Sequence, residues 1–201
     1  MMQKFISLFI PMFILMDFIG TLPVFISLTR KKEPRERARI AILSSIVAGG
    51  FVSVFALSGK QILEYFDISI EAVKAGGGLL LLYIAFEMIL SGQLLYDKSM
   101  DDPEERSIIV SPLAIPMLAG PGSMTFAMIV FLESPGFEKI YLFAAIILSV
   151  ICGAMLLSIS SFIQKILGNE FTRGLEKVTA IIVSFIALEM IMSGIKGYFF
   201  P

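Results

Sequence analysis

Three carboxylic acids, Asp17, Glu87 and Glu189, lie inside long apolar runs of the sequence. A charged side chain at the centre of a membrane helix costs about 2.5–3.5 kcal/mol, and no Lys or Arg is expected at matching depth to offset that cost. An ionised carboxylate there needs a cation or a watery cavity, so we predict that at least one of the three binds a coupling ion, either a proton or sodium. For Glu87 and Glu189, hydrogen bonds between helices are an equally good explanation.

The backbone of two apolar runs is a second source of polar groups. Asp17 and Gly20 lie near the middle of the first run, and the sequence Gly120-Pro121-Gly122 lies near the middle of the fourth. Proline removes a backbone N–H and glycine weakens a helix, so we predict that both helices are broken near the membrane midplane. Unpaired N–H and C=O groups are costly in hydrocarbon, and a bound ligand could satisfy them.

These two breaks predict a substrate-binding site. The first N–H groups of a half-helix that starts near Ser123 favour an anionic group such as a carboxylate, and Thr21 is expected to cap the second half of the first helix. The alternative is that both breaks are kinks whose polar groups are satisfied by neighbouring Ser and Thr. The predicted substrate-binding residues are Asp17, Gly20, Thr21, Pro23, Gly120, Pro121, Gly122, Ser123 and Thr125.

The residue types that most enzymes use are scarce. The chain has no histidine, which is the commonest general base and metal ligand, and its one cysteine, Cys152, lies in an apolar run. Only carboxylates are left for acid–base work, because no Ser or Cys stands beside a recognisable base. We therefore predict that the protein is not an enzyme, with no catalytic residues, no metal ligands and no cofactor apart from the coupling ion.

The elements that position these groups are membrane helices. Of the 201 residues, 57% are hydrophobic and only 16% are charged, which is typical of an integral membrane protein. A spanning helix needs roughly 20 residues. The sequence predicts one all-α transmembrane domain, residues 1–201, with six spans at 4–28, 40–59, 75–95, 108–132, 139–162 and 177–199.

Basic residues predict how these spans are oriented. The first connection, residues 30–39, holds six of them and should be cytoplasmic. If the spans alternate, the cytoplasmic side carries eleven Lys and Arg residues and the other side carries five. We therefore expect a multi-pass protein of the cell (inner) membrane with both termini outside the cytoplasm.

An internal repeat divides the chain into residues 1–98 and 107–201. Residues 84–92 and 186–194 are identical at seven of nine positions, and residues 10–12 match residues 115–117 in the same order. Because each repeat holds three helices, the second must begin on the opposite side of the membrane, so the repeats are inverted. Many secondary transporters have this architecture, with a substrate site at the repeat interface. The alternative is that duplication only produced a stable helix bundle.

The chain resembles the MarC family of six-helix inner-membrane proteins over essentially its full length. Two motifs carry the resemblance, Met16-Asp17-Phe18-Ile19-Gly20-Thr21-Leu22-Pro23-Val24-Phe25 and Pro112-Leu113-Ala114-Ile115-Pro116-Met117-Leu118-Ala119-Gly120-Pro121-Gly122. Some members look like transporters of small neutral amino acids such as glycine and alanine. The resemblance therefore implies a carrier of such solutes, whose carboxylate suits a half-helix N-terminus and whose ammonium group suits Asp17.

We expect a secondary transporter of small neutral amino acids or similar solutes that works by alternating access. Its partners are the lipid bilayer and that solute, with no nucleic acid; assembly into a homo-oligomer is left open. Two other classes stay open as well: a non-transporting assembly or regulatory membrane protein, and an intramembrane enzyme that uses carboxylates alone.

Overall fold

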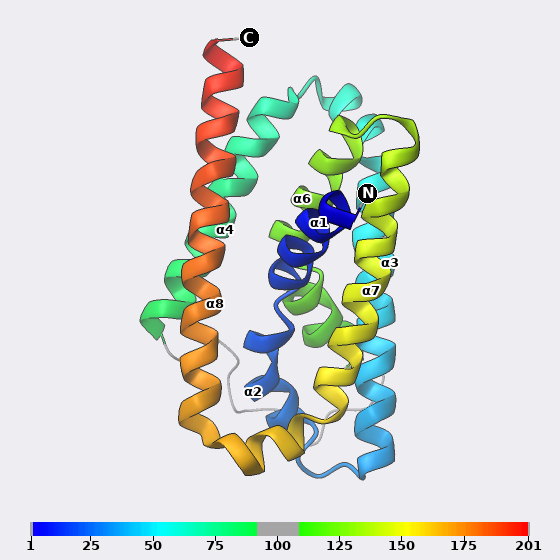
Figure 1. Cartoon of the computed structure of the whole chain (residues 1–201), viewed down its shortest axis with the longest axis vertical. Helices are drawn as coiled ribbons and strands as arrows, with labels where there is room; N and C mark the ends of the chain where they lie inside the picture. Colours follow the sequence, from blue (N-terminus) through cyan, green and yellow to red (C-terminus); the bar gives the residue numbers. More distant parts are fainter. Residues whose placement is uncertain (1, 92–108, 201) are drawn as a thin grey trace.

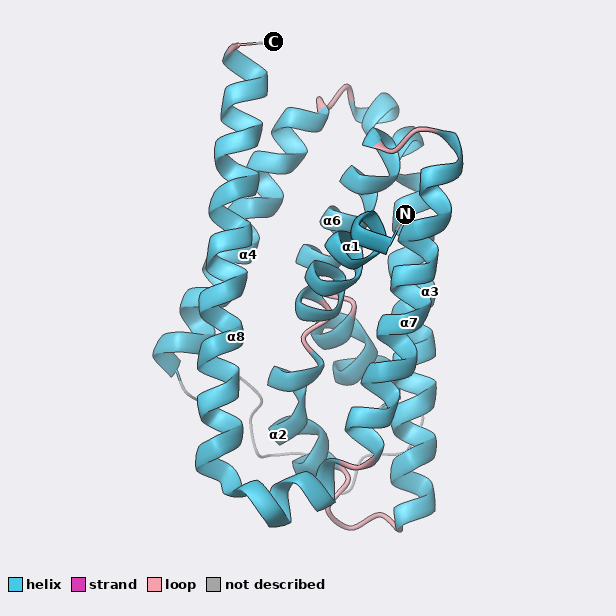
Figure 2. Cartoon of the chain, viewed as in Figure 1, coloured by secondary structure: helices cyan, strands magenta, loops and turns pink. Residues whose placement is uncertain are grey.

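The computed structural model describes residues 2–91 and 109–200, and this part of the chain is almost entirely helical, with no strand (Figure 2). The predicted span end at 95 and the predicted repeat limits at 98 and 107 lie outside it. The elements are α1 (Met2–Leu15), α2 (Phe18–Leu28), α3 (Pro34–Phe66), α4 (Ile70–Ser91), the π-helix η1 (Ile109–Leu118), α6 (Pro121–Glu133), the short 3₁₀-helix η2 (Gly136–Glu138), α7 (Lys139–Ser158) and α8 (Ser160–Phe199).

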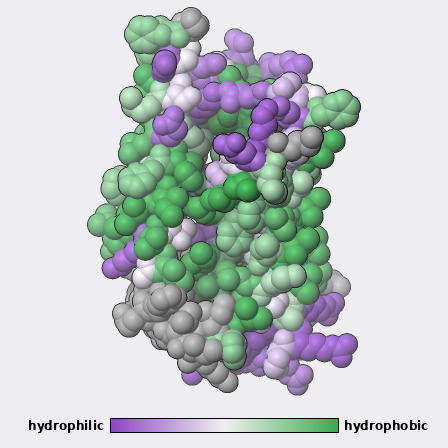
Figure 3. Space-filling model, viewed as in Figure 1, coloured by the Kyte–Doolittle hydropathy of each residue, from purple (hydrophilic) through white to green (hydrophobic). Residues whose placement is uncertain are grey.

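The surface has the pattern of a membrane protein. On the face drawn in Figure 3, hydrophilic residues gather at the two ends of the molecule, and hydrophobic residues cover most of the surface between them. Among the described residues, five helical segments are long and apolar enough to cross a bilayer, and they are Met2–Leu22, Pro34–Phe66, Ile70–Leu90, Gly136–Ser158 and Lys177–Phe199. The prediction of an all-α membrane protein is confirmed.

Two of the predicted spans are each divided between two helices: the first, 4–28, between α1 and α2, and the fourth between η1 and α6. The described residues of the fourth span, 109–132, correspond to η1 and to α6, a shorter apolar helix of 13 residues, rather than to one long helix. The chain is interrupted between them because Pro121 cannot donate a backbone hydrogen bond to continue η1.

The helices are arranged in three groups (Figure 1). The long helices α4 and α8 pack against each other on one side, and α3 and α7 pack against each other on the other side. The short helices α1, α2, η1 and α6 lie between these pairs; α1, α2 and α6 contact both pairs, and η1 packs mainly against α3. Fully buried side chains from the short helices, including Met12, Phe18 and Leu113, form the centre of the main core with residues of α3 and α7.

The short helices of the N-terminal part and those of the C-terminal part run in opposite directions along the molecule (Figure 1). In Figure 1, α1 and α2 run downward and are followed by the long helices α3 and α4. The chain then runs upward through η1 and α6 and continues into the long helices α7 and α8.

Candidate functional site

The first interruption of a helix is centred on Asp17. α1 ends at Leu15 and α2 begins at Phe18, and between them Asp17 has a left-handed backbone with φ 44° and ψ 48°. Asp and Asn tolerate this conformation better than most residues. The Asp17 carboxylate accepts a hydrogen bond from the N–H of Gly20 at 3.0 Å, so Asp17 is the N-cap of α2.

The prediction that Thr21 caps α2 is wrong. Thr21 lies within the first turn, where its hydroxyl donates to the Asp17 carbonyl at 2.7 Å and its N–H donates to the same carbonyl at 3.0 Å. Because the helix starts earlier than we expected, the capping position belongs to Asp17. A single acidic residue therefore determines where α2 begins.

The second interruption separates η1 from α6. The Ala119 N–H donates to the Ala114 carbonyl at 2.8 Å, the wide turn of a π-helix, and Gly120 is then extended with φ −76° and ψ 167°. The buried hydroxyl of Ser123 donates to the Gly120 carbonyl at 3.0 Å. The first N–H groups of a helix have no acceptor within that helix, so the first turn of α6 presents its N–H groups to the interruption.

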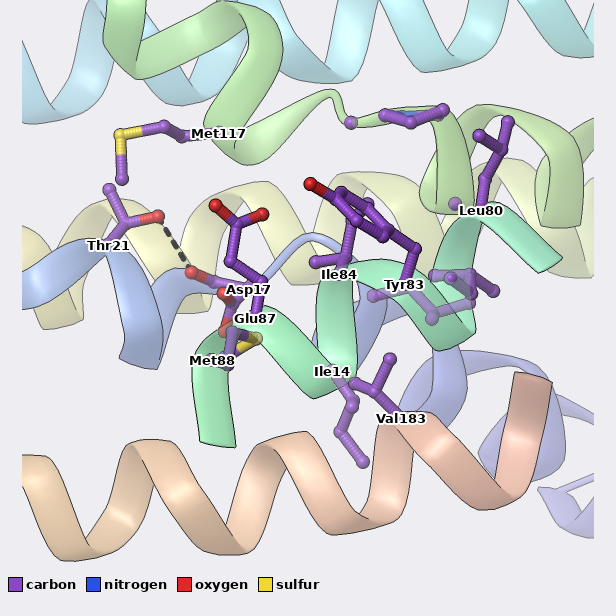
Figure 4. Close-up of a pocket in the computed structure, with 15 residues that line it drawn as sticks. Ile14, Asp17, Thr21, Leu80, Tyr83, Ile84, Glu87, Met88, Met117 and Val183 are labelled. Carbon is purple, nitrogen blue, oxygen red and sulfur yellow. Dashed lines mark hydrogen bonds between the residues drawn. The ribbon is translucent and has the colours of Figure 1, made fainter. Parts of the chain in front are cut away.

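Both interruptions border one cavity of about 400 Å³ (Figure 4). α4 forms the opposite wall, and Val183 of α8 also lines the cavity. The wall is largely apolar, and among the described residues that line the cavity none is basic. The lining residues are Ile14, Leu15, Asp17, Thr21, Leu80, Leu81, Tyr83, Ile84, Glu87, Met88, Met117, Gly120, Pro121, Gly122 and Val183.

Five of the predicted substrate-binding residues line this cavity, and these are Asp17, Thr21, Gly120, Pro121 and Gly122. Gly20, Ser123 and Thr125 are not among the residues that line it. Gly20 is buried beneath the Asp17 carboxylate, Ser123 is buried with its hydroxyl on the backbone, and Thr125 packs against Gly77 of α4. Pro23 lies farther along α2.

The three carboxylic acids that the sequence singled out fall into two groups. Asp17 and Glu87 are partly buried and line the cavity, and Figure 4 shows the Glu87 side chain projecting from α4 beside Asp17. Glu189 is exposed on the outer face of α8 together with Phe185 and Met192. The two glutamates of the repeated motif therefore occupy different environments.

Tyr83 is a polar residue of the cavity that the sequence analysis missed. It lies one helical turn before Glu87, and Figure 4 shows both side chains directed into the same space. The spacing of four residues places Tyr83 and Glu87 on one face of a helix and was a usable signal. Within the described residues, 2–91 and 109–200, no group of three His, Cys, Asp or Glu side chains could hold a metal ion.

The fold and the cavity define a helical integral membrane protein with a partly polar chamber between two interrupted helices. The family model for MarC family integral membrane proteins matches residues 2–199, so the chain belongs to the MarC family, as its motifs indicated.

Its relatives cover the whole chain. The UPF0056 membrane protein MJ1677 of Methanocaldococcus jannaschii is 37% identical over 201 residues, which span 98% of each chain. The UPF0056 membrane protein YvbG of Bacillus subtilis is 30% identical over 99% of this chain and 98% of its own. The UPF0056 inner membrane protein YhgN of Escherichia coli K12 is 29% identical over 97% of this chain and 98% of its own. No solved structure matches the chain.

Proposed function

We propose that this protein is a secondary transporter that carries small neutral amino acids, or similar small solutes, by alternating access at the cavity. The observation that supports this most strongly is that both interruptions, which are far apart in the sequence, border the same chamber as Glu87. Interrupted helices whose ends point at a central cavity are how many transporters bind polar solutes inside a membrane. A cavity of about 400 Å³ is of the size that small-molecule sites have.

The packing of the helices supports an inverted repeat. α2 packs against α8 just as α6 packs against α4, and α1 packs against α7 just as η1 packs against α3. The opposite directions of the two halves agree with this correspondence (Figure 1). A chain built this way can exchange the conformations of its halves and so open the site to either side in turn.

The chemistry of the wall suits a zwitterion. The carboxyl groups of Asp17 and Glu87, which both line the cavity, favour an ammonium group, because hydrogen bonds between an ammonium group and a carboxylate are stronger than those between neutral groups. The first turn of α6 favours a carboxylate, because its N–H groups carry the positive end of the helix dipole. The apolar wall leaves room for a short, uncharged side chain. In the ion-coupled cycle that we propose, the same carboxyl groups hold a proton or sodium.

The proposed orientation has both termini outside the cytoplasm and the connection between α2 and α3 inside. The cytoplasmic (inner) membrane is the proposed location, in keeping with the inner membrane protein YhgN among the relatives. The protein is proposed not to be an enzyme and to bind no nucleic acid. The exposed position of Glu189 within an apolar span favours contact with a second copy, since a carboxyl group is costly against lipid.

Uptake into proteoliposomes tests the proposed function. The purified chain would be reconstituted, and uptake of labelled glycine, alanine and serine would be measured under an inward sodium gradient, an inward proton gradient and neither. We expect saturable uptake of at least one of these solutes, driven by one of the two gradients. Equal accumulation in protein-free vesicles under every condition would contradict the proposal.

A further inference from the structure

We propose that the seam between α4 and α6 is a gate to the cavity, and that the ion pair between Lys74 and Glu133 latches it. The inference rests on the proposed transport function, because it concerns how a solute reaches the same chamber. α4 belongs to the first repeat and α6 to the second, so the seam lies between the parts that must move relative to each other in alternating access.

The latch lies at one end of the seam. Lys74 is in the second turn of α4 and Glu133 is the last residue of α6, and their side chains form an ion pair. The Lys74 side chain is only 16% exposed, whereas that of Glu133 is 50% exposed. An ammonium group that is enclosed to this degree needs its carboxylate partner while the seam is closed. Because Glu133 still reaches solvent, water can take over from Lys74 when the seam opens.

Close backbone packing continues from the latch toward the cavity. Gly77 of α4 lies directly against the side chain of Thr125, so no side chain would fit between the two helices there. Closer to the cavity, Gly122 of α6 lies directly against the side chain of Leu81, which is 3% exposed. Both Leu81 and Gly122 line the cavity, so the seam leads from the latch to its wall.

A second ion pair lies at the same end of the molecule. Lys4 of α1 pairs with Glu138 of η2, which follows α6 directly in the chain. This pair also joins the first repeat to the second, and its side chains are 64% and 38% exposed. Two ion pairs between the repeats at the end where α6 finishes hold the halves together there. A partly exposed pair shifts an equilibrium by only about fivefold, which suits a gate that must also open.

Thiol labelling tests the gate without requiring a substrate. The single native cysteine would be removed by Cys152→Ala, and Thr125→Cys would place a reporter within the seam beside Gly77. A membrane-impermeant maleimide added on the Lys74 side should label the reporter slowly. With Lys74→Gln or Glu133→Gln, labelling should become about fivefold faster. Exchange of the charges, Lys74→Glu with Glu133→Lys, should restore the slow rate.

A matched control is available on α3. Lys60 and Glu64 form an ion pair at 3.5 Å whose side chains are 68% and 67% exposed, and it joins no two helices. Lys60→Gln with Glu64→Gln should leave the labelling rate unchanged. The gate is overturned if Lys74→Gln and Glu133→Gln are both labelled at the rate of the parent protein. It is also overturned if the protein with exchanged charges is labelled as fast as these two single variants.

Cross-linking keeps the test decisive if the single variants fold poorly. Lys74→Cys with Glu133→Cys, joined by a short bifunctional thiol reagent, should stop transport, and transport that continues after complete cross-linking overturns the gate. Labelling that responds to the latch in a protein that carries no solute would retain the gate and count against the proposed function. Transport of a solute by a protein whose labelling does not respond to the latch variants would support the proposed function and overturn the gate.

Discussion

The carboxylate of Asp17 accepts the N–H of Gly20 at 3.0 Å while Asp17 also lines the cavity, so one side chain both starts α2 and contributes to the site. These two roles can be separated by substitution. Asn caps helices as well as Asp and tolerates a left-handed backbone, but it cannot carry a negative charge. Ala can do neither.

We predict that Asp17→Asn changes the free energy of unfolding by less than about 0.5 kcal/mol and abolishes ion-coupled uptake. Asp17→Ala should lower the free energy of unfolding by about 1–3 kcal/mol, because it loses the cap and places Ala in a left-handed conformation. Denaturation in detergent and uptake in proteoliposomes measure the two effects. If Asp17→Asn transports normally, the charge of Asp17 has no part in coupling.

The two glutamates of the repeated motif should differ in their effect on coupling. Glu87 lines the cavity and Glu189 faces outward, so Glu87→Gln should alter the dependence of uptake on pH or sodium, whereas Glu189→Gln should not. The measurement is initial uptake rate across a series of proton and sodium concentrations. An unchanged dependence in Glu87→Gln would remove this residue from the proposed coupling site.

Two glycines of α4 should differ in how well they tolerate a side chain, because Gly78 faces α8 and Gly76 does not. A Cβ at Gly78 would lie 2.7 Å from the carbonyl oxygen of Ala187 and 3.0 Å from the N of Ile191, and backbone atoms cannot easily move away. Gly78→Ala should therefore destabilise the protein by about 1–3 kcal/mol. Gly76→Ala is the control, because a Cβ there meets nothing within 4 Å and alanine favours a helix by up to about 1 kcal/mol. The measurement is the unfolding temperature of each variant. Equal changes in the unfolding temperatures of Gly78→Ala and Gly76→Ala would contradict this prediction.

Ser149 of α7 should tolerate the loss of its hydroxyl. It is fully buried, and within the described part of the chain its Oγ has no hydrogen-bond partner. Ser149→Ala should therefore raise the free energy of unfolding by about 1 kcal/mol or leave it unchanged. Ser45 is the matched control, since it is equally buried but its hydroxyl donates to the Ala41 carbonyl at 2.7 Å. Ser45→Ala should be the more destabilising of the two, and the reverse order in chemical denaturation would contradict this.

Much of this architecture could be predicted because hydrophobic length is a local property of the sequence. The apolar runs predicted spanning helices, and Pro and Gly predicted that the chain near Gly120 would not continue as one helix. The length of α3 was underestimated. It continues to Phe66 through Lys60 and Glu64, because a helix can extend past the apolar segment into the interface.

The environment of each side chain could not be predicted in the same way. Residues 84–92 and 186–194 are nearly identical, yet Glu87 lines the cavity and Glu189 is exposed. The difference comes from which helices pack against α4 and α8, and that depends on contacts between distant parts of the chain. The apolar wall from α4 was missed for the same reason, since the apolar residues of α4 are spread around the helix and do not mark one face.

Counterflow in proteoliposomes tests the central claim, that the cavity is a solute-carrying site, most directly. Vesicles loaded with unlabelled glycine or alanine should transiently concentrate the labelled solute from outside, and Ile84→Trp, which fills the cavity, should reduce this at least about tenfold. Ile46→Trp adds the same bulk at a position on α3 that is 54% exposed and should have no effect. Counterflow that persists in Ile84→Trp, or that is absent from the unaltered protein for every small solute offered, would contradict the account.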